Sequence, residues 1–230
     1  AINVVALFAR LRIVASPEFD DMLNSSELRP SRIRPTLKQD GKSMILGIFM
    51  PLASFAMFHM VTIFPLSWVF LYSNDPPEAV LYSLIWGSVA GIVSIVASGY
   101  IADKIGRRRL LMLGALAIGA FAVLGPLLLA GGREGATTYI VLGFVLLGLS
   151  FGQSSGVIAS LFGKKNRYTA SALVASLSWM FGAGFAPLTA LSMSSVLGLW
   201  AAGVYLGSGV ICTVIAIQSS RRGQMEITDE

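Results

Sequence analysis

The side chains that could do chemistry in this sequence are few, and they stand in the middle of long apolar runs. His59 is the one histidine of the chain, and an imidazole there could bind an anionic solute or change protonation between about pH 5 and 8. A neutral histidine bonded to a neighbouring helix explains it equally well. Gln153, with Ser150 and Ser154, interrupts a second run, where such groups bind a solute or join two helices. Trp179 interrupts a third run, and core packing is its favoured role over stacking against a solute.

The polar and ionisable side chains within the apolar runs also argue against catalysis. The apolar runs contain no paired carboxylates, no cluster of histidines and no nucleophile beside a base, so we do not expect an enzyme. The sequence has no glycine-rich phosphate loop through which ATP could drive the protein. Cys212, the single cysteine, lies in an apolar run, which excludes a disulfide framework and a cysteine-based metal cluster. We therefore expect neither a cofactor nor a metal.

The composition indicates a membrane protein. Of the 230 residues, 55% are hydrophobic and 13% are charged, against roughly 25% charged residues in soluble domains. The mean hydropathy is +0.74. A net charge of +5 would suit nucleic acid if the basic residues shared a soluble face, but here they stand between apolar runs. Nucleic-acid binding is therefore excluded, and the lipid bilayer is the expected surroundings.

Six apolar stretches are long enough to cross a bilayer as helices, which needs about 20 residues each. They cover residues 44–73, 79–102, 110–131, 138–163, 168–195 and 198–219. They lack the polar and apolar alternation of barrel strands, so we expect an all-α membrane protein. Pro51, Pro65, Pro126 and Pro187 should bend or interrupt their helices, because proline removes a backbone donor.

The basic residues predict how the spans are oriented. Every Lys and Arg except Arg133 lies before residue 44, within 103–109, within 164–167 or after 219. Positively charged short loops stay on the cytoplasmic side. We therefore expect a multi-pass protein of the cell (cytoplasmic) membrane with both ends of this segment in the cytoplasm.

The spans and the charges divide the chain into four parts. Residues 1–12 begin with an apolar run and are interpreted as the end of a preceding transmembrane helix. Residues 13–43 are mixed in charge and contain three prolines, which indicates a cytoplasmic linker. Residues 44–219 form the six-helix bundle, and residues 220–230 form a cytoplasmic tail. An ordinary N-terminal tail is the alternative for the first part, but it explains the apolar start poorly.

The loop between the second and third spans contains a spaced set of glycines and charges. Gly99 would allow close helix approach, Asp103 places a carboxylate at the membrane boundary, and Gly106 would turn the chain, with Arg107 and Arg108 holding the loop inside. This set closely resembles the G-x-x-x-D-x-x-G-R-K/R signature of the major facilitator superfamily. The resemblance implies one half of a twelve-helix transporter, built from two inverted three-helix repeats. It also implies a conformational gating role for the loop and a missing N-terminal six-helix half.

A second loop resembles one subfamily of this superfamily in particular. Phe162 to Ala170, with Lys165, Arg167 and Tyr168, is similar to the cytoplasmic loop of the metabolite:proton symporter subfamily. Members of that subfamily carry proline and betaine, citrate, 2-oxoglutarate or shikimate. Ser160 and Gly163 replace an acid and a proline of the subfamily pattern, which leaves the substrate open.

Together these features predict a secondary active transporter that works by alternating access. The resemblance implies a small organic acid or osmolyte as the solute and a proton as its partner in symport. The resemblance also implies that the first and fourth spans line a central cavity, and these spans carry His59 and Gln153. The alternatives are a drug or sugar carrier of the same superfamily, or a non-transporting six-helix membrane subunit.

Overall fold

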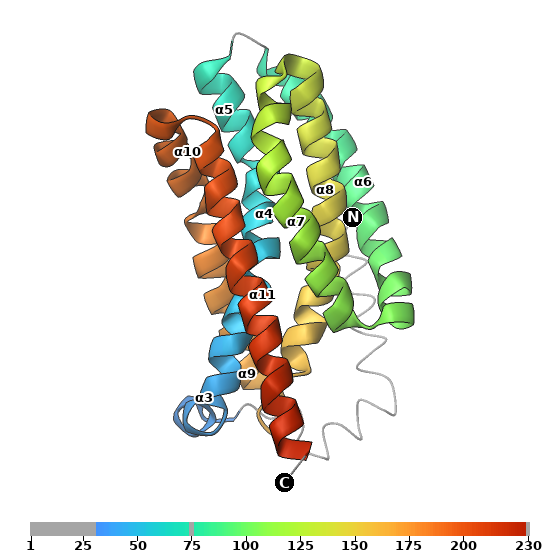
Figure 1. The fold of residues 1–230 in the computed structure, drawn as a ribbon, viewed down its shortest axis with the longest axis vertical. Coiled ribbons are helices and arrows are strands. Elements are labelled where there is room, and N and C mark those ends of the chain that lie inside the picture. Colours follow the sequence, from blue (N-terminus) through green and yellow to red (C-terminus); the bar gives the residue numbers. More distant parts are fainter. Residues whose placement is uncertain (1–30, 74–75, 229–230) are drawn as a thin grey trace, which may run out of the picture.

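The computed structural model describes residues 31–73 and 76–228, and for Pro77 and residues 221–228 it describes the backbone alone. Six helical stretches in this part of the chain are long and apolar enough to cross a membrane, which confirms the six predicted spans. They lie side by side in one elongated bundle (Figure 1). The helices are α3 (Ile33–Phe49), α4 (Leu52–Thr62), α5 (Phe64–Tyr72), α6 (Pro77–Ile105), α7 (Arg107–Ala130), α8 (Gly132–Ala159), α9 (Arg167–Trp179), η1 (Met180–Gly184), α10 (Ala186–Leu197) and α11 (Trp200–Thr228).

The first span is broken into α3, α4 and α5 near its two prolines. Pro51 stands between α3 and α4, and Pro65 lies in the first turn of α5. Proline cannot donate the helical hydrogen bond and clashes with the preceding turn, so both breaks follow from the sequence as predicted.

Both ends of the described chain are more helical than expected. Residues 33–43, assigned from the sequence to the linker, belong to α3. Residues 220–228, assigned to the tail, continue α11. The expected end of a preceding helix, residues 1–12, lies outside the described residues, as does the linker up to residue 30.

The fifth span is also interrupted. Between α9 and α10 the backbone forms a short π-helix, η1, and Pro187 lies in the first turn of α10. Short π-helical turns inside α-helices are frequent at functional sites. This irregular backbone begins immediately after Trp179.

Pro126 does not interrupt its helix, because α7 continues through it. A proline removes the hydrogen bond to the carbonyl four residues earlier, here that of Ala122. Gly203 of α11 packs directly against this carbonyl, so that no side chain could fit between them. The absence of a Cβ at Gly203 therefore lets α11 cover the place where the helical bond is lost.

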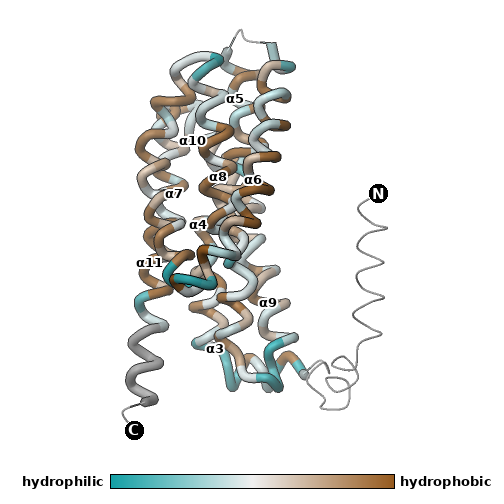
Figure 2. The backbone as a smooth tube through the Cα atoms, turned by 90° about the vertical axis from the view of Figure 1, so that its right-hand side faces the viewer, coloured by the Kyte–Doolittle hydropathy of each residue, from teal (hydrophilic) through white to brown (hydrophobic). Residues whose placement is uncertain are grey.

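Close packing organises the bundle. α6 packs along α8, and α7 packs against both α8 and α11. Figures 1 and 2 show α7 and α11 side by side on one face of the bundle, with α4 behind them. The hydrophobic core lies among α4, α7, α8 and α11, where Met57, Met60, Phe121 and Ile140 are buried. Figure 2 shows apolar residues along the middle of the bundle and polar residues gathered toward the ends of the helices.

Candidate functional site

Five rings from three spans form the most distinctive side-chain cluster of the bundle. We call it the aromatic cluster: Phe55, Phe58 and His59 of α4, Phe151 of α8, and Trp179 of α9. Trp179 is its centre, with ring centroids 4.8 Å from Phe55, 5.2 Å from Phe58, 5.9 Å from Phe151 and 6.5 Å from His59. The two residues named from the sequence, His59 and Trp179, are thus brought together.

Local sequence explains how the cluster is positioned. Phe55, Phe58 and His59 lie three and four residues apart, so they share one face of α4. On the other side Gly182 of η1 allows the close approach, because a Cβ added there would lie 2.8 Å from the Cβ of Phe55. Phe55 is buried, whereas the other four members of the cluster each keep part of their surface accessible.

The imidazole of His59 has unused hydrogen-bonding capacity. Its Nδ1 atom is buried and has no hydrogen-bond partner among the described residues. Buried polar atoms are normally satisfied, and the exceptions call for a functional or solvent partner. Among the described residues the histidine is therefore not held by a neighbouring helix through Nδ1.

The polar residues predicted on α8 have different surroundings. Ser150 shares a hydrogen bond with Ser54 of α4, and Ser154 donates to the Ser150 carbonyl at 3.3 Å. Gln153 donates from Nε2 to the Ser98 hydroxyl of α6 at 2.9 Å. All three α8 side chains are buried. The structure therefore uses them to join helices or to bond within α8, and it does not bring Gln153 beside His59.

Gln153 instead lies beside the loop between α6 and α7. A polar cavity of about 310 Å³ opens there, between the end of α6 and α8. Gly106 has a φ of 89°, so the turn uses a backbone conformation that favours glycine. The cavity is lined by Ile95, Gly99, Ala102, Asp103, Arg107, Gly152, Gln153, Ser155 and Gly156.

The glycines and arginines of this loop have separate roles. Arg107 lies over Gly156 of α8, where an added Cβ would meet its guanidinium at 2.7 Å. Arg108 donates from Nη2 to the Ile217 carbonyl of α11 at 2.7 Å. The close helix approach expected at Gly99 is wrong for the described residues, since none of their atoms lies within 4 Å of a Cβ built there. In this structure Gly99 forms part of the cavity wall instead.

The loop between α8 and α9 is fastened to α3. Asn166 is buried and donates from Nδ2 to the Asp40 carboxylate at 2.7 Å and to the Gln39 side-chain oxygen at 3.1 Å. The residues predicted in this loop, Lys165, Arg167 and Tyr168, are exposed. Arg167 donates from Nε to the Phe162 carbonyl at 3.3 Å.

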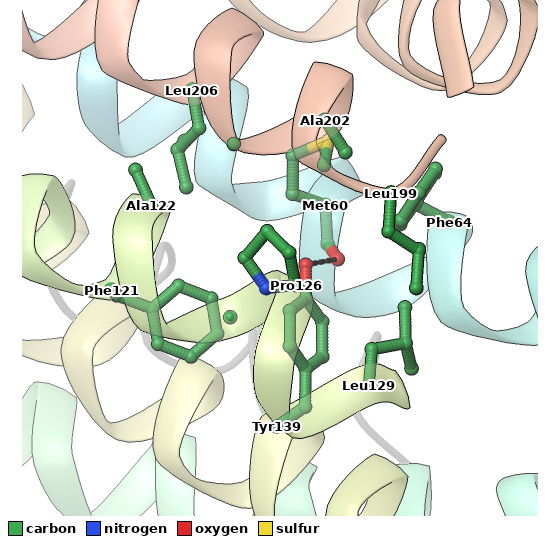
Figure 3. A pocket seen from close by; sticks show the side chains of 12 residues that line it. Met60, Phe64, Phe121, Ala122, Pro126, Leu129, Tyr139, Leu199, Ala202 and Leu206 are labelled. Atoms are coloured by element: carbon green, nitrogen blue, oxygen red, sulfur yellow. Dashed lines mark hydrogen bonds between the residues drawn. The ribbon is translucent and has the colours of Figure 1, made fainter. Parts of the chain in front are cut away.

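A second cavity lies among α4, α7, α8 and α11 and is lined by apolar side chains. Figure 3 shows Tyr139 within it, with the hydroxyl directed at the Met60 carbonyl, to which it donates at 2.9 Å. Its volume is about 10 Å³, roughly the space of one water molecule. This cavity is too small for a metabolite, so it is part of the core.

Sequence reasoning did not identify Phe55, Phe58 and Phe151 as members of the site. The spacing of the two phenylalanines before His59 was a usable signal, because it places them on one helical face. Phe151 gave no such signal, since its membership depends on how α8 is rotated against α4. Asn166 was likewise missed because its partners lie on a distant helix.

Comparison with known proteins finds transporters. The sequence profile of the sugar (and other) transporter family matches residues 14–227. A putative metabolite transport protein of Haemophilus influenzae is 27% identical over 94% of this chain and 52% of its own length. The inner membrane metabolite transport protein YhjE of Escherichia coli is 26% identical over 93% of this chain and 50% of its own length. No solved structure matches the chain.

The chain thus spans about half the length of the curated relatives it matches. The prediction that the chain belongs to a transporter family and not to an enzyme family is confirmed, because the family and the matched relatives are described as transporters. Six apolar helices and a profile match over nearly the whole chain lead to one conclusion. This protein belongs to the sugar (and other) transporter family of the major facilitator superfamily.

Proposed function

We propose that residues 1–230 form the C-terminal half of a secondary transporter that moves a small organic acid or osmolyte across the cytoplasmic membrane. The observation that carries the proposal is the length of the match. These residues supply six spans, yet the matched relatives are about twice as long. A second six-helix half would supply the opposite wall of a central cavity, and alternating access would follow from rocking of the two halves.

The solute site is proposed at the aromatic cluster. Ionisable groups within a membrane are costly and mark functional positions. His59 supports this location, because its Nδ1 has no partner among the described residues and the rings beside it are partly accessible. A proton is the proposed coupling ion, with His59 as the candidate carrier in this half.

The loop between α6 and α7 is proposed as the gating motif. Asp103 and Arg107 share one cavity wall with Gln153 of α8, so charged and hydrogen-bonding groups meet at the basic end of the bundle. With the cytoplasm at this end, Asp103 would latch the two halves when the transporter opens outward. The concentration of Lys and Arg at this end supports that orientation.

Uptake by reconstituted protein tests the proposal. The full-length protein and residues 1–230 alone are placed in separate liposomes, with an inward proton gradient present or absent. Labelled organic acids, N-methylated amino acids and sugars are offered to each. We expect uptake by the full-length protein, stimulated by the gradient, and none above empty liposomes by residues 1–230. Uptake by residues 1–230 alone would instead establish a complete transporting subunit.

A sugar carrier is the second candidate, because the matched family is described as sugar (and other) transporters. The same uptake experiment separates the two candidates. Sugar uptake without uptake of acids or osmolytes would replace the proposed solute class. Absence of any uptake by the full-length protein would favour a non-transporting membrane subunit.

A further inference from the structure

The break between α3 and α4 is bridged by a side chain of another helix. In an uninterrupted helix the Phe49 carbonyl would accept a hydrogen bond from the backbone N–H of Ala53. Here the buried hydroxyl of Thr213, on α11, stands between these two groups. It accepts from the Ala53 N–H at 3.0 Å and donates to the Phe49 carbonyl at 3.2 Å. A side chain inserted into the helical ladder in this way keeps a helix bent.

A second hydroxyl reaches the same break from the fifth span. Ser178 of α9 is fully buried and donates to the Ile48 carbonyl at 2.9 Å. Its single proton is shared with the Val174 carbonyl of its own helix, at 2.8 Å. Ser178 comes directly before Trp179, where α9 ends and the π-helix η1 begins. The interruptions of the first and fifth spans therefore lie side by side and are joined by a hydrogen bond.

Between these interruptions and the loop between α8 and α9, the helices α3 and α9 are fastened to each other. Figures 1 and 2 show the two helices together at one end of the bundle. A Cβ added to Gly47 of α3 would lie 3.0 Å from the Val174 Cγ1 of α9, so the helices are in tight contact there. Nearer the start of α3, Asn166 donates to the Asp40 carboxylate at 2.7 Å. We call these two helices the α3–α9 pair.

The α3–α9 pair has a hydrophobic core of its own, separate from the main core. Its buried members are Met44, Ile158, Phe162, Ala170 and Val174. The main core begins beyond the Pro51 break, with Ala53 of α4. α8 and α11 continue past this level without a break. Packed elements that are joined to the rest by a few irregular residues are the usual units of hinge motion.

We propose that Thr213 and Ser178 are positioning residues of a hinge on which the α3–α9 pair tilts as one unit. Trp179 ends α9 and so moves with the pair, whereas Phe55 and Phe58 belong to α4, beyond the break. The tilt therefore changes how Trp179, which is stacked on Phe55 at 4.8 Å, lies against the rings of α4. In this way a movement at the basic end of the bundle reaches the aromatic cluster. The consequence for a solute rests on the proposed transport function, whereas the hinge itself does not.

Distances between spin labels test the hinge in the full-length protein in lipid bicelles. Labels are attached to cysteines that replace Lys42 on α3, Ala172 on α9 and Leu116 on α7, two at a time. All three side chains are exposed. The parent for these measurements carries Cys212→Ala and no other reactive cysteine, and every variant shares this background. The three pairwise distances are measured by electron paramagnetic resonance.

Thr213→Val removes the hydroxyl and keeps the size of the side chain. Because a buried backbone group without a partner is costly, the Phe49 carbonyl and the Ala53 N–H are expected to bond each other and change the bend. Lys42 and Ala172 each lie seven residues from their break, at Phe49 and Trp179. A change of about 20° in the bend moves such a site by about 4 Å. Both distances to α7 should shift by about this amount, while the distance between α3 and α9 stays constant.

Two further variants assign the shift to the hydroxyl of Thr213. Thr213→Ser keeps this hydroxyl and should give the parental distances. Thr138→Val is the matched control, because it removes the same group from a threonine that donates within α8, to the Glu134 carbonyl at 2.9 Å. It should leave all three distances unchanged. Size-exclusion profiles identical to the parent show that each variant is folded. If Thr213→Val fails to fold, Ser178→Ala removes the other hydroxyl of the hinge and takes its place.

The outcomes separate this inference from the proposed function. Parental distances in Thr213→Val would overturn the hinge, and a shift of α3 without α9 would overturn the pair as one unit. A transported solute should be taken up more slowly by Thr213→Val than by Thr213→Ser, up to about tenfold. Equal uptake with shifted distances would overturn the link to the aromatic cluster. If the full-length protein transports nothing, the transport proposal fails, while the distances still decide the hinge.

Discussion

Gly148 is the position where the packing of α6 on α8 is least able to accept a change. A Cβ added there would lie 2.7 Å from the Gly91 carbonyl oxygen, 2.7 Å from the Ser94 Cβ and 3.0 Å from the Ile95 nitrogen. Ordinary contacts of a Cβ begin at 3.4 Å, so α6 would have to retreat by about 0.7 Å. Two of the three obstructing atoms are backbone, and a rotamer change cannot move them.

Gly148→Ala should therefore destabilise the protein. Overpacking of a well-packed site costs about 1–3 kcal/mol, and the better helix propensity of alanine offsets up to about 1 kcal/mol of this. The expected net loss is about 1–2 kcal/mol. The same retreat lengthens the bond from Gln153 to Ser98, which is 2.9 Å in the parent and lies little more than one helical turn further along α8.

The free energy of unfolding is measured for the purified protein in lipid bicelles by steric trapping. Gly207→Ala is the control, because no atom lies within 4 Å of a Cβ built at Gly207 of α11. That variant should be as stable as the parent, or more stable by up to about 1 kcal/mol. If Gly148→Ala and Gly207→Ala have the same stability, the close approach of α6 and α8 does not limit the bundle, and the prediction is wrong.

Three further predictions test other parts of the molecule. His59→Ala in the full-length protein should weaken solute binding or flatten the dependence of uptake on pH between about 5 and 8; unchanged kinetics across that range would assign His59 a structural role. Asp103→Asn should slow transport and favour the inward-open state by about 0.3–2 kcal/mol, measured by cysteine accessibility from each side; parental labelling and turnover would show that the latch is absent. Tyr139→Phe should lower the unfolding free energy by about 0.6–1.7 kcal/mol, the cost of a lost hydrogen bond within a membrane bundle, here the bond to the Met60 carbonyl; an unchanged value would mean that water replaces the hydroxyl.

The spans could be predicted from the sequence because bilayer thickness sets a minimum apolar length. The proline breaks at Pro51 and Pro65 followed for a similarly local reason, the missing backbone donor. The start of α3 could not be predicted in this way. Hydropathy marks where a helix enters the membrane, whereas α3 continues back to Ile33 through polar residues, with Asp40 held by Asn166 of a distant loop.

The site was predictable only in part because depth along a span does not give the rotation of a helix. His59 and Trp179 were each identified from their own span, and their pairing depends on packing between α4 and α9 that no local pattern encodes. Gln153 has a comparable position in its span, yet α8 turns it toward Ser98 of α6. Ser98 gave no signal of its own, since a single serine in an apolar helix has many ordinary explanations.

Two interrupted spans meet at the aromatic cluster. α4 ends at Thr62, three residues after His59, and the π-helix η1 begins directly after Trp179. The two breaks therefore flank a pair of rings whose centroids are 6.5 Å apart. Pro65 accounts for the first break, but η1 contains no proline and needs another explanation.

The surroundings of η1 supply that explanation. Irregular backbone at membrane depth is tolerated only where it is buried in protein or lines a cavity. On one side Gly182 packs on Phe55, and its carbonyl accepts a hydrogen bond from the Tyr205 hydroxyl at 3.4 Å, so protein holds the π-helical turn there. Beside it lie the partly accessible rings of Phe58 and Trp179. Protein therefore buries η1 only on the side that faces the bundle. On the side where these rings are accessible, the backbone is expected to line a cavity. A solute cavity completed by the proposed other half of the transporter would meet this requirement.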